Sequence, residues 1–275
     1  MCIVNFEQLL MKIILSRKGF DSSSGKQANP IMPDGTLLSL PIPDEEDANT
    51  FSSLQWEGRS YFDIIHSLYP KTFISNDSRC HLDPDLRKEA RFRHPNWKPA
   101  FGQMNASLSH LRNQKVSIGD IFLFYGWFRE TELREGHLRY KKDGLDAHII
   151  YGYMQIGEII ERKEDVPDWL KDHPHFAYDN AWKANKNAIF LSSDKLTLIP
   201  SLCGCNNLRY RRDRVLTKEG MSRRYWDLPD FFRQVSISYN SKSWQEDSFK
   251  SAGRGQEFVI DATPEILSWA AKIIR

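Results

Sequence analysis

Two long apolar runs near the middle of the chain constrain the fold more than any other feature. The first covers residues 121–128, directly after a Gly119-Asp120 turn, and the second covers residues 148–160. Apolar runs bounded by turn signals predict buried strands. Glycine at positions 126, 152 and 157 predicts bulges or sheet corners within them. The second run is therefore either one bulged strand or a pair of strands.

Shorter patterns surround this centre. Apolar spacing predicts helices at residues 61–69 and 103–113, and a terminal helix that Thr263 caps and Pro264 begins. Residues 80–99 are rich in His, Arg, Pro and Asp and predict a long loop, which is unusual in a compact domain unless it has a function. Further strands are expected at residues 13–15, 36–40, 188–191, 196–199, 235–239 and 257–260. Together these elements predict an α+β fold with a mixed, mostly antiparallel sheet and flanking helices.

The composition limits the class of protein. The 275 residues carry a net charge of +2, so a basic surface that coats nucleic acid is not expected. No apolar stretch is long enough to cross a membrane, and four cysteines do not form a disulfide framework, so we expect a cytoplasmic protein. We expect one domain over residues 11–275, with residues 1–10 as an extension outside it.

The segment that follows the first strand is unusually polar. Ser16 to Gly25 holds hydroxyls, two cations and two glycines at the mouth of a buried strand. Such loops are common ligand sites, and these groups suit an anion, most simply a phosphate. Asp21 is a candidate general base, or it neutralises the cations. The expected phosphate or nucleotide ligands are Ser16, Arg17, Lys18, Ser22, Ser23, Ser24 and Gly25.

Histidines and cysteines offer weaker candidates for chemistry. In His173-Pro174-His175 the alternate positions of an extended chain bring both rings to one side, and we assign both histidines with Asp21 as candidate catalytic residues. A third ligand is not evident nearby. Cys203-Gly204-Cys205 lacks the second pair that would favour zinc, so the sequence predicts no metal site. The acidic run 44–47 is interpreted as a solvated loop.

Basic and aromatic residues alternate in two segments, residues 87–97 and 208–226. Cations that contact phosphates and rings that stack on bases would both be available there, although a solvated basic loop has the same composition. Tyr125 and Trp127 belong to the core or form a stacking wall for a base. The candidate nucleic-acid contacts are Arg209, Arg211, Arg212, Arg223 and Arg224.

Two resemblances add to this interpretation. The string from Lys12 to Gly25, with Pro30 to Gly35 and Leu40 to Pro43, resembles the third type of nucleotide modification associated domain, over nearly the whole chain from Met11. That family implies a role in nucleic-acid base modification, including phage conflict, and brings no known catalytic residues. Weaker similarity of residues 119–125 and 150–159 to PUA-like barrels implies a partly open barrel as the alternative form of the sheet.

The sequence therefore predicts a protein that binds a nucleotide, either free or within DNA or RNA. It leaves open a base-modifying enzyme, a non-catalytic reader of modified nucleic acid, and a nucleotide-sugar or sugar-phosphate enzyme. It specifies no cofactor and no oligomeric state.

Overall fold

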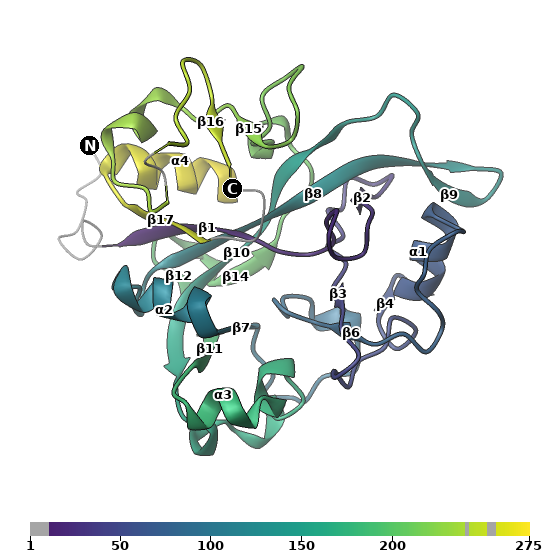
Figure 1. Ribbon diagram of the computed structural model, residues 1–275, viewed down its shortest axis with the longest axis horizontal. Helices are drawn as coiled ribbons and strands as arrows, with labels where there is room; N and C mark the ends of the chain where they lie inside the picture. The colour runs from purple at the N-terminus through teal and green to yellow at the C-terminus, as the bar shows by residue number, and fades with distance from the viewer. Residues whose placement is uncertain (1–10, 240–241, 252–256) are drawn as a thin grey trace.

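A nine-stranded mixed sheet forms the centre of the computed structural model, which describes residues 11–239, 242–251 and 257–275 (Figure 1). Its main path runs β17-β1-β8-β10-β11-β7, and β2, β9 and β14 pair with the long central strands. The strands of this sheet are β1 (Lys12–Arg17), β2 (Asn29–Ile31), β7 (Ala100–Met104), β8 (Ile121–Arg134), β9 (His137–Tyr140), β10 (Asp146–Ile160), β11 (Asn187–Ser192), β14 (Cys205–Asn207) and β17 (Glu257–Asp261).

The two long apolar runs are β8 and β10, which pair antiparallel at the middle of the sheet. Their registers shift between Ile150 and Gly152 and between Ile156 and Glu158, so the predicted bulges are confirmed at two of the three glycines. Gly126 has a different role, because a Cβ there would lie 2.8 Å from the Lys18 carbonyl oxygen. β1 runs parallel to β8 and β2 also runs parallel to it, whereas the other pairs of this sheet are antiparallel.

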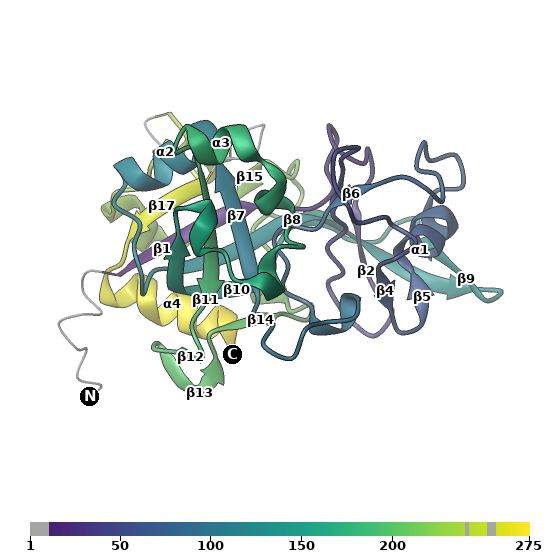
Figure 2. The same cartoon turned by 90° about the horizontal axis from the view of Figure 1, so that it is seen from below.

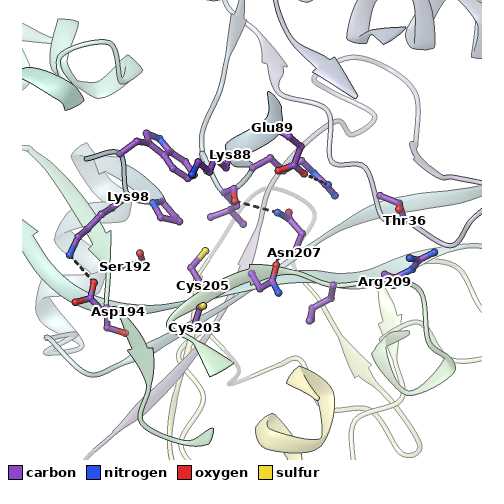
Figure 3. Close-up of a pocket in the computed structure, with 17 residues that line it drawn as sticks. Thr36, Lys88, Glu89, Lys98, Ser192, Asp194, Cys203, Cys205, Asn207 and Arg209 are labelled. Carbon is purple, nitrogen blue, oxygen red and sulfur yellow. Dashed lines mark hydrogen bonds and ion pairs between the residues drawn. The ribbon is translucent and has the colours of Figure 1, made fainter. Parts of the chain in front are cut away.

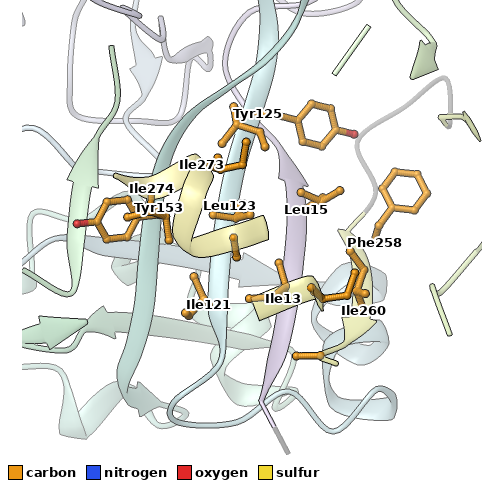
Figure 4. Close-up of a cluster of buried hydrophobic side chains, with 14 of the residues drawn as sticks. Ile13, Leu15, Ile121, Leu123, Tyr125, Tyr153, Phe258, Ile260, Ile273 and Ile274 are labelled. Carbon is orange, nitrogen blue, oxygen red and sulfur yellow. The ribbon is translucent and has the colours of Figure 1, made fainter. Parts of the chain in front are cut away.

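Helices cover both faces of the sheet. Figure 2 shows α4 (Pro264–Ile274) on one face and α2 (Asn105–Asn113) with α3 (Asp179–Lys183) on the other. The alternation of side chains along β1 explains this arrangement: Ile13 and Leu15 pack in the cluster with α4, and Ile14 packs in the cluster with α2. Figure 4 shows the cluster with α4, where side chains from β1, β8, β10 and β17 meet the helix.

A smaller layer lies beside the sheet, at the right in Figure 1. Helix α1 (Tyr61–Leu68) packs there against β9, and a separate apolar cluster around Phe20, Phe51 and Tyr61 holds the layer together. The short strands outside the main sheet are β3 (Ile42–Pro43), β4 (Gln55–Trp56), β5 (Arg59–Ser60), β6 (Cys80–His81), β12 (Lys195–Leu196), β13 (Ile199–Cys203), β15 (Tyr225–Trp226) and β16 (Phe249–Lys250).

The predicted α+β class and the mostly antiparallel sheet are confirmed. The sheet is open, since no pairing among the described residues joins its edge strands β17 and β7. The described strands therefore do not form a closed barrel. The predicted strand at 36–40 is wrong, because the segment forms two isolated bridges, Leu37 to Ile31 and Thr36 to Arg209, and no continuous strand. The strand at 235–239 is likewise reduced to one bridge, and the predicted strand at 196–199 is a hairpin in which Leu196 of β12 pairs with Ile199 of β13.

The second helix begins at Asn105 rather than 103, because Gln103 and Met104 complete β7. The proposed extension, residues 1–10, lies outside the described residues. Among the helices that the structure describes, none has the length and apolar character needed to span a bilayer.

Candidate functional site

The polar segment that follows β1 is a tight turn built around Asp21. Its carboxylate oxygen Oδ1 accepts the backbone N–H groups of Ser23 and Ser24 and the Ser23 hydroxyl, each at 2.7 Å. Gly25 closes the turn at φ +83°, and a Cβ there would lie within 2.6 Å of the Phe20 ring. The donors that the sequence assigned to a phosphate thus bind a carboxylate of the chain itself, and a phosphate would have to displace Asp21 to use them.

Asp21 also pairs with Arg17 at the end of β1. Burial raises the pKa of Asp21, but the hydrogen bonds from Ser23, Arg17 and the two backbone N–H groups outweigh burial and lower it. Asp21 is therefore an anion at neutral pH. Ser16 lies behind the turn, fully buried, and donates to Glu257 Oε1 at 3.3 Å.

One side of this turn forms the wall of a cavity of about 600 Å³, which we call the loop cavity. It is lined on the turn side by Arg17, Lys18, Gly19, Asp21, Ser23 and Ser24, and on the opposite side by Ile42, Asp44, His81, Asp83, Gln103, Met104, His175 and Tyr178. Five of the predicted phosphate or catalytic residues of the turn therefore share a cavity with His175. Ser22, Gly25 and His173 are not part of its lining.

His81, Asp83 and His175 form a compact cluster within the lining, and we call it the His-Asp cluster. One ligand atom of each lies within 4.8 Å of the other two. Asp83 Oδ2 is 4.0 Å from His81 Nε2 and 3.9 Å from His175 Nε2. The three side chains are 12, 4 and 4 % exposed, so the cluster is nearly shielded from bulk water.

The outer nitrogen of each imidazole is fixed by a partner. His81 Nδ1 lies 3.1 Å from Asp47 Oδ2, and Asp47 Oδ1 accepts N–H groups from residues 48 and 49. His175 Nδ1 lies 2.7 Å from Asn187 Oδ1, while the Asn187 amide nitrogen donates to the His175 carbonyl. Each partner oxygen requires a proton on Nδ1, so the Nε2 atom of a neutral ring presents its lone pair towards Asp83.

Burial and charge set the protonation of the cluster. Burial raises the pKa of Asp83, but contact with His173 and the charges of His175, His173 and His81 outweigh burial and bring it to about 2. Burial lowers the pKa of His175 to about 4, against the attraction of Asp83. For His81 burial is the largest cause and lowers the pKa, yet Asp47, Asp83 and Asp44 together raise it. At neutral pH the cluster therefore presents an anionic carboxylate beside a neutral His175.

Lys18 lies on the turn side of the loop cavity. Its Nζ is 3.3 Å from Glu257 Oε1 and 4.6 Å from the centre of the Phe101 ring. Glu257 also accepts Gln103 Nε2 at 2.6 Å. This network holds the ammonium group at the cavity wall, where it can reach an anionic ligand.

A second hollow of about 460 Å³ shares Arg17 and Asp21 with the loop cavity. It is lined by Ser22, Trp127, His148, Arg223 and Arg224 among others. The Trp127 ring carries the Arg223 guanidinium 3.8 Å from its centre, so one ring face is already covered. Tyr125 is 1 % exposed and packs edge-on against Trp226 in the core, so its ring has no face open to a ligand.

The basic block does not form one surface. Arg223 and Arg224 line the second hollow, whereas Arg209 pairs with Asp34 beside a third hollow of about 520 Å³. Arg211 pairs with Asp213, and Arg212 with Glu219. Figure 3 shows the third hollow, with Lys98 paired to Asp194 at one edge and Cys203 and Cys205 in its lining. Arg87, Lys98 and Arg209 of this hollow are each held in an ion pair.

Sequence reasoning missed His81, Asp83 and Asp47. A signal was present, because His81 and Asp83 are two residues apart on extended chain and so share a face, within a loop of unusual length. The interpretation of residues 44–47 as a solvated loop is wrong for Asp47, whose side chain is 2 % exposed and bonded to His81. Arg93 of the basic segment is also buried, in a bidentate pair with Asp85.

The fold and site define an α+β protein whose loop cavity combines cations, carboxylates and imidazoles, a composition typical of functional sites. The chain belongs to the nucleotide modification associated domain 3 family, whose model matches residues 12–261. Neither the comparison with curated proteins nor the comparison with solved structures gave a match.

Proposed function

We propose that this protein is an enzyme of a base-modification system that binds a nucleotide, free or within nucleic acid, in the loop cavity. One observation carries the proposal: the polar turn after β1 and the His-Asp cluster line the same cavity. The turn offers a cation to a phosphate, and the cluster offers groups that can accept or transfer a proton. The family name supports the connection with nucleotide modification.

A catalytic role is favoured over a non-catalytic reader because of how the cluster is built. A reader needs an open basic surface and a free stacking ring. Of the two candidate rings, Tyr125 is buried and Trp127 has one face covered by Arg223, and the arginines of the basic block are dispersed. The shielded carboxylate Asp83, held anionic beside a neutral His175, is the kind of perturbed pair that active sites contain.

Nucleic acid would approach through the second hollow. Arg223, Arg224 and Ser22 line it, and Arg17 and Asp21 line both this hollow and the loop cavity. In this arrangement the hollow contacts the phosphates of a strand while the target nucleotide occupies the loop cavity.

Calorimetric titration with AMP, GMP, CMP, dTMP and inorganic phosphate tests the proposal, with the Lys18→Met variant as the probe. Loss of a charged hydrogen bond to phosphate should weaken binding roughly 10- to 100-fold. Lys26→Met is the matched control, because Lys26 belongs to the same turn but is exposed and lies 5.4 Å from the Phe73 ring, outside the cavity lining. Equal binding by the two variants would contradict the proposal.

A further inference from the structure

The donor atoms of the His-Asp cluster have the chemistry and the spacing of a metal centre. We propose that His81 Nε2, Asp83 Oδ2 and His175 Nε2 bind one divalent transition-metal ion whose open positions face the loop cavity. Atoms that share one ion at metal–ligand distances near 2.1 Å stand roughly 3.0 to 3.4 Å apart. The two nitrogen–oxygen distances of 3.9 and 4.0 Å therefore need to shorten by about 0.5 to 1 Å, which small side-chain rotations provide.

The surroundings of the cluster orient its ligands. Metal-binding histidines commonly donate their other ring N–H to a carboxylate or carbonyl oxygen, which raises their basicity and fixes their orientation. Asp47 Oδ2 accepts this bond from His81 Nδ1, and the Asn187 amide oxygen accepts it from His175 Nδ1. Asp47 and Asn187 come from different segments of the chain, yet each accepts the Nδ1–H of one cluster histidine.

Asp83 is held by its other oxygen. The Gly102 N–H donates to Asp83 Oδ1 at 2.6 Å, which leaves Oδ2 directed at the two imidazoles. His173 Nε2 lies 3.4 Å from Oδ1 and is buried without a hydrogen bond. His173 therefore belongs to the support of the centre rather than to its ligands.

Charge in the loop cavity gives a second, independent argument. Its lining contains two cations, Arg17 and Lys18, and three carboxylates, Asp21, Asp44 and Asp83. These five groups sum to a formal charge of −1, which favours a bound cation in the cavity. A divalent ion would change the sign of this charge and would offer the phosphate a direct ligand position.

The donor set defines the class of ion. Two imidazoles and one carboxylate suit Fe²⁺, Co²⁺, Zn²⁺ and Mn²⁺, and three protein ligands with open positions are typical of catalytic rather than structural centres. The catalytic part of this inference rests on the proposed function, whereas binding of the ion does not.

Titration of the EDTA-treated protein with Co²⁺ and Zn²⁺ tests the centre. We expect one ion per chain and, with Co²⁺, visible absorption bands of a nitrogen–oxygen site. His81→Gln and Asp83→Asn should each weaken binding roughly 100-fold. His137→Gln, an exposed histidine of β9, is the matched control and should bind as the wild type does. Wild type that binds no ion, or ligand variants that bind as well as the control, would overturn the proposal.

A measurement on the unaltered chain covers the case in which a ligand variant does not fold. Mn²⁺ should broaden the side-chain NMR signals of His81 and His175 at substoichiometric concentration and leave His137 sharp. Equal broadening of all three signals would overturn the proposal. Lys18→Met should keep its affinity for Co²⁺ while it loses AMP, so failure of the metal centre and failure of nucleotide binding give different results.

Discussion

Substitution of Gly102 by alanine tests how tightly the His-Asp cluster is packed. An ideal Cβ at position 102 would lie 2.1 Å from His175 Cδ2, 2.2 Å from Cγ and 2.7 Å from Nδ1. Ordinary contact begins at 3.4 Å, so the ring must retreat by about 1.3 Å. A retreat of that size breaks the 2.7 Å hydrogen bond to Asn187.

Two effects of Gly102→Ala lower the free energy of unfolding. Overpacking costs about 1–3 kcal/mol, and the buried amide oxygen left without a donor costs about 1–3 kcal/mol more. We therefore expect Gly102→Ala to lower the free energy of unfolding by about 2–6 kcal/mol in urea denaturation. Affinity for Co²⁺ should fall as well, because His175 Nε2 moves with its ring.

A double-mutant cycle with His175→Ala isolates the clash. Once the imidazole is removed, the added methyl group has space, so Gly102→Ala should cost less than about 1 kcal/mol in that background. If the alanine destabilises both backgrounds equally, the close approach of Gly102 to His175 is not the cause and the reasoning fails.

Three further predictions concern stability. Arg93→Met leaves the buried Asp85 carboxylate without its bidentate partner and should lower the free energy of unfolding in urea by about 3–5 kcal/mol; a loss below about 1 kcal/mol would refute this. Burial, with the charges of Arg17 and Arg223, lowers the pKa of His148 to about 3, so the unfolded chain binds more protons below pH 6.5 and stability falls with acidification. His148→Gln should remove about 2 kcal/mol of the loss between pH 6.5 and pH 5, and an unchanged slope would contradict it. Thr263→Ala removes the hydroxyl that caps α4 and should cost about 1 kcal/mol in the same denaturation assay, and an unchanged free energy of unfolding would contradict this.

The sequence predicts the fold better than it predicts the site. Strands β8 and β10 can be predicted from their own residues, because their apolar runs are long and bounded by turns. The cap of α4 and the bulges at Gly152 and Gly157 are also signalled by the residues that form them, without distant contacts. The prediction of a strand at residues 36–40 relied on the strong turn signal before them. It was wrong because no neighbouring strand pairs with these residues over their length.

The site depends on contacts that local patterns do not contain. Arg17 and His175 are far apart in the sequence, and they share the loop cavity only because the order β1-β8-β10-β11-β7 brings their segments together. Polar groups are also ambiguous until their partners are known. Asp47 looked like a solvated charge and Arg93 like a phosphate contact, yet each is buried with an ionic partner.

The central claim is that a nucleotide binds in the loop cavity between Lys18 and the His-Asp cluster. A crystal structure of the protein with a bound nucleoside monophosphate tests it most directly. The account predicts the phosphate within hydrogen-bond distance of Lys18 Nζ, and the nucleotide bordered by His81, Asp83 and His175. A nucleotide that occupies the hollow beside Arg209, with the loop cavity filled only by water, would contradict it.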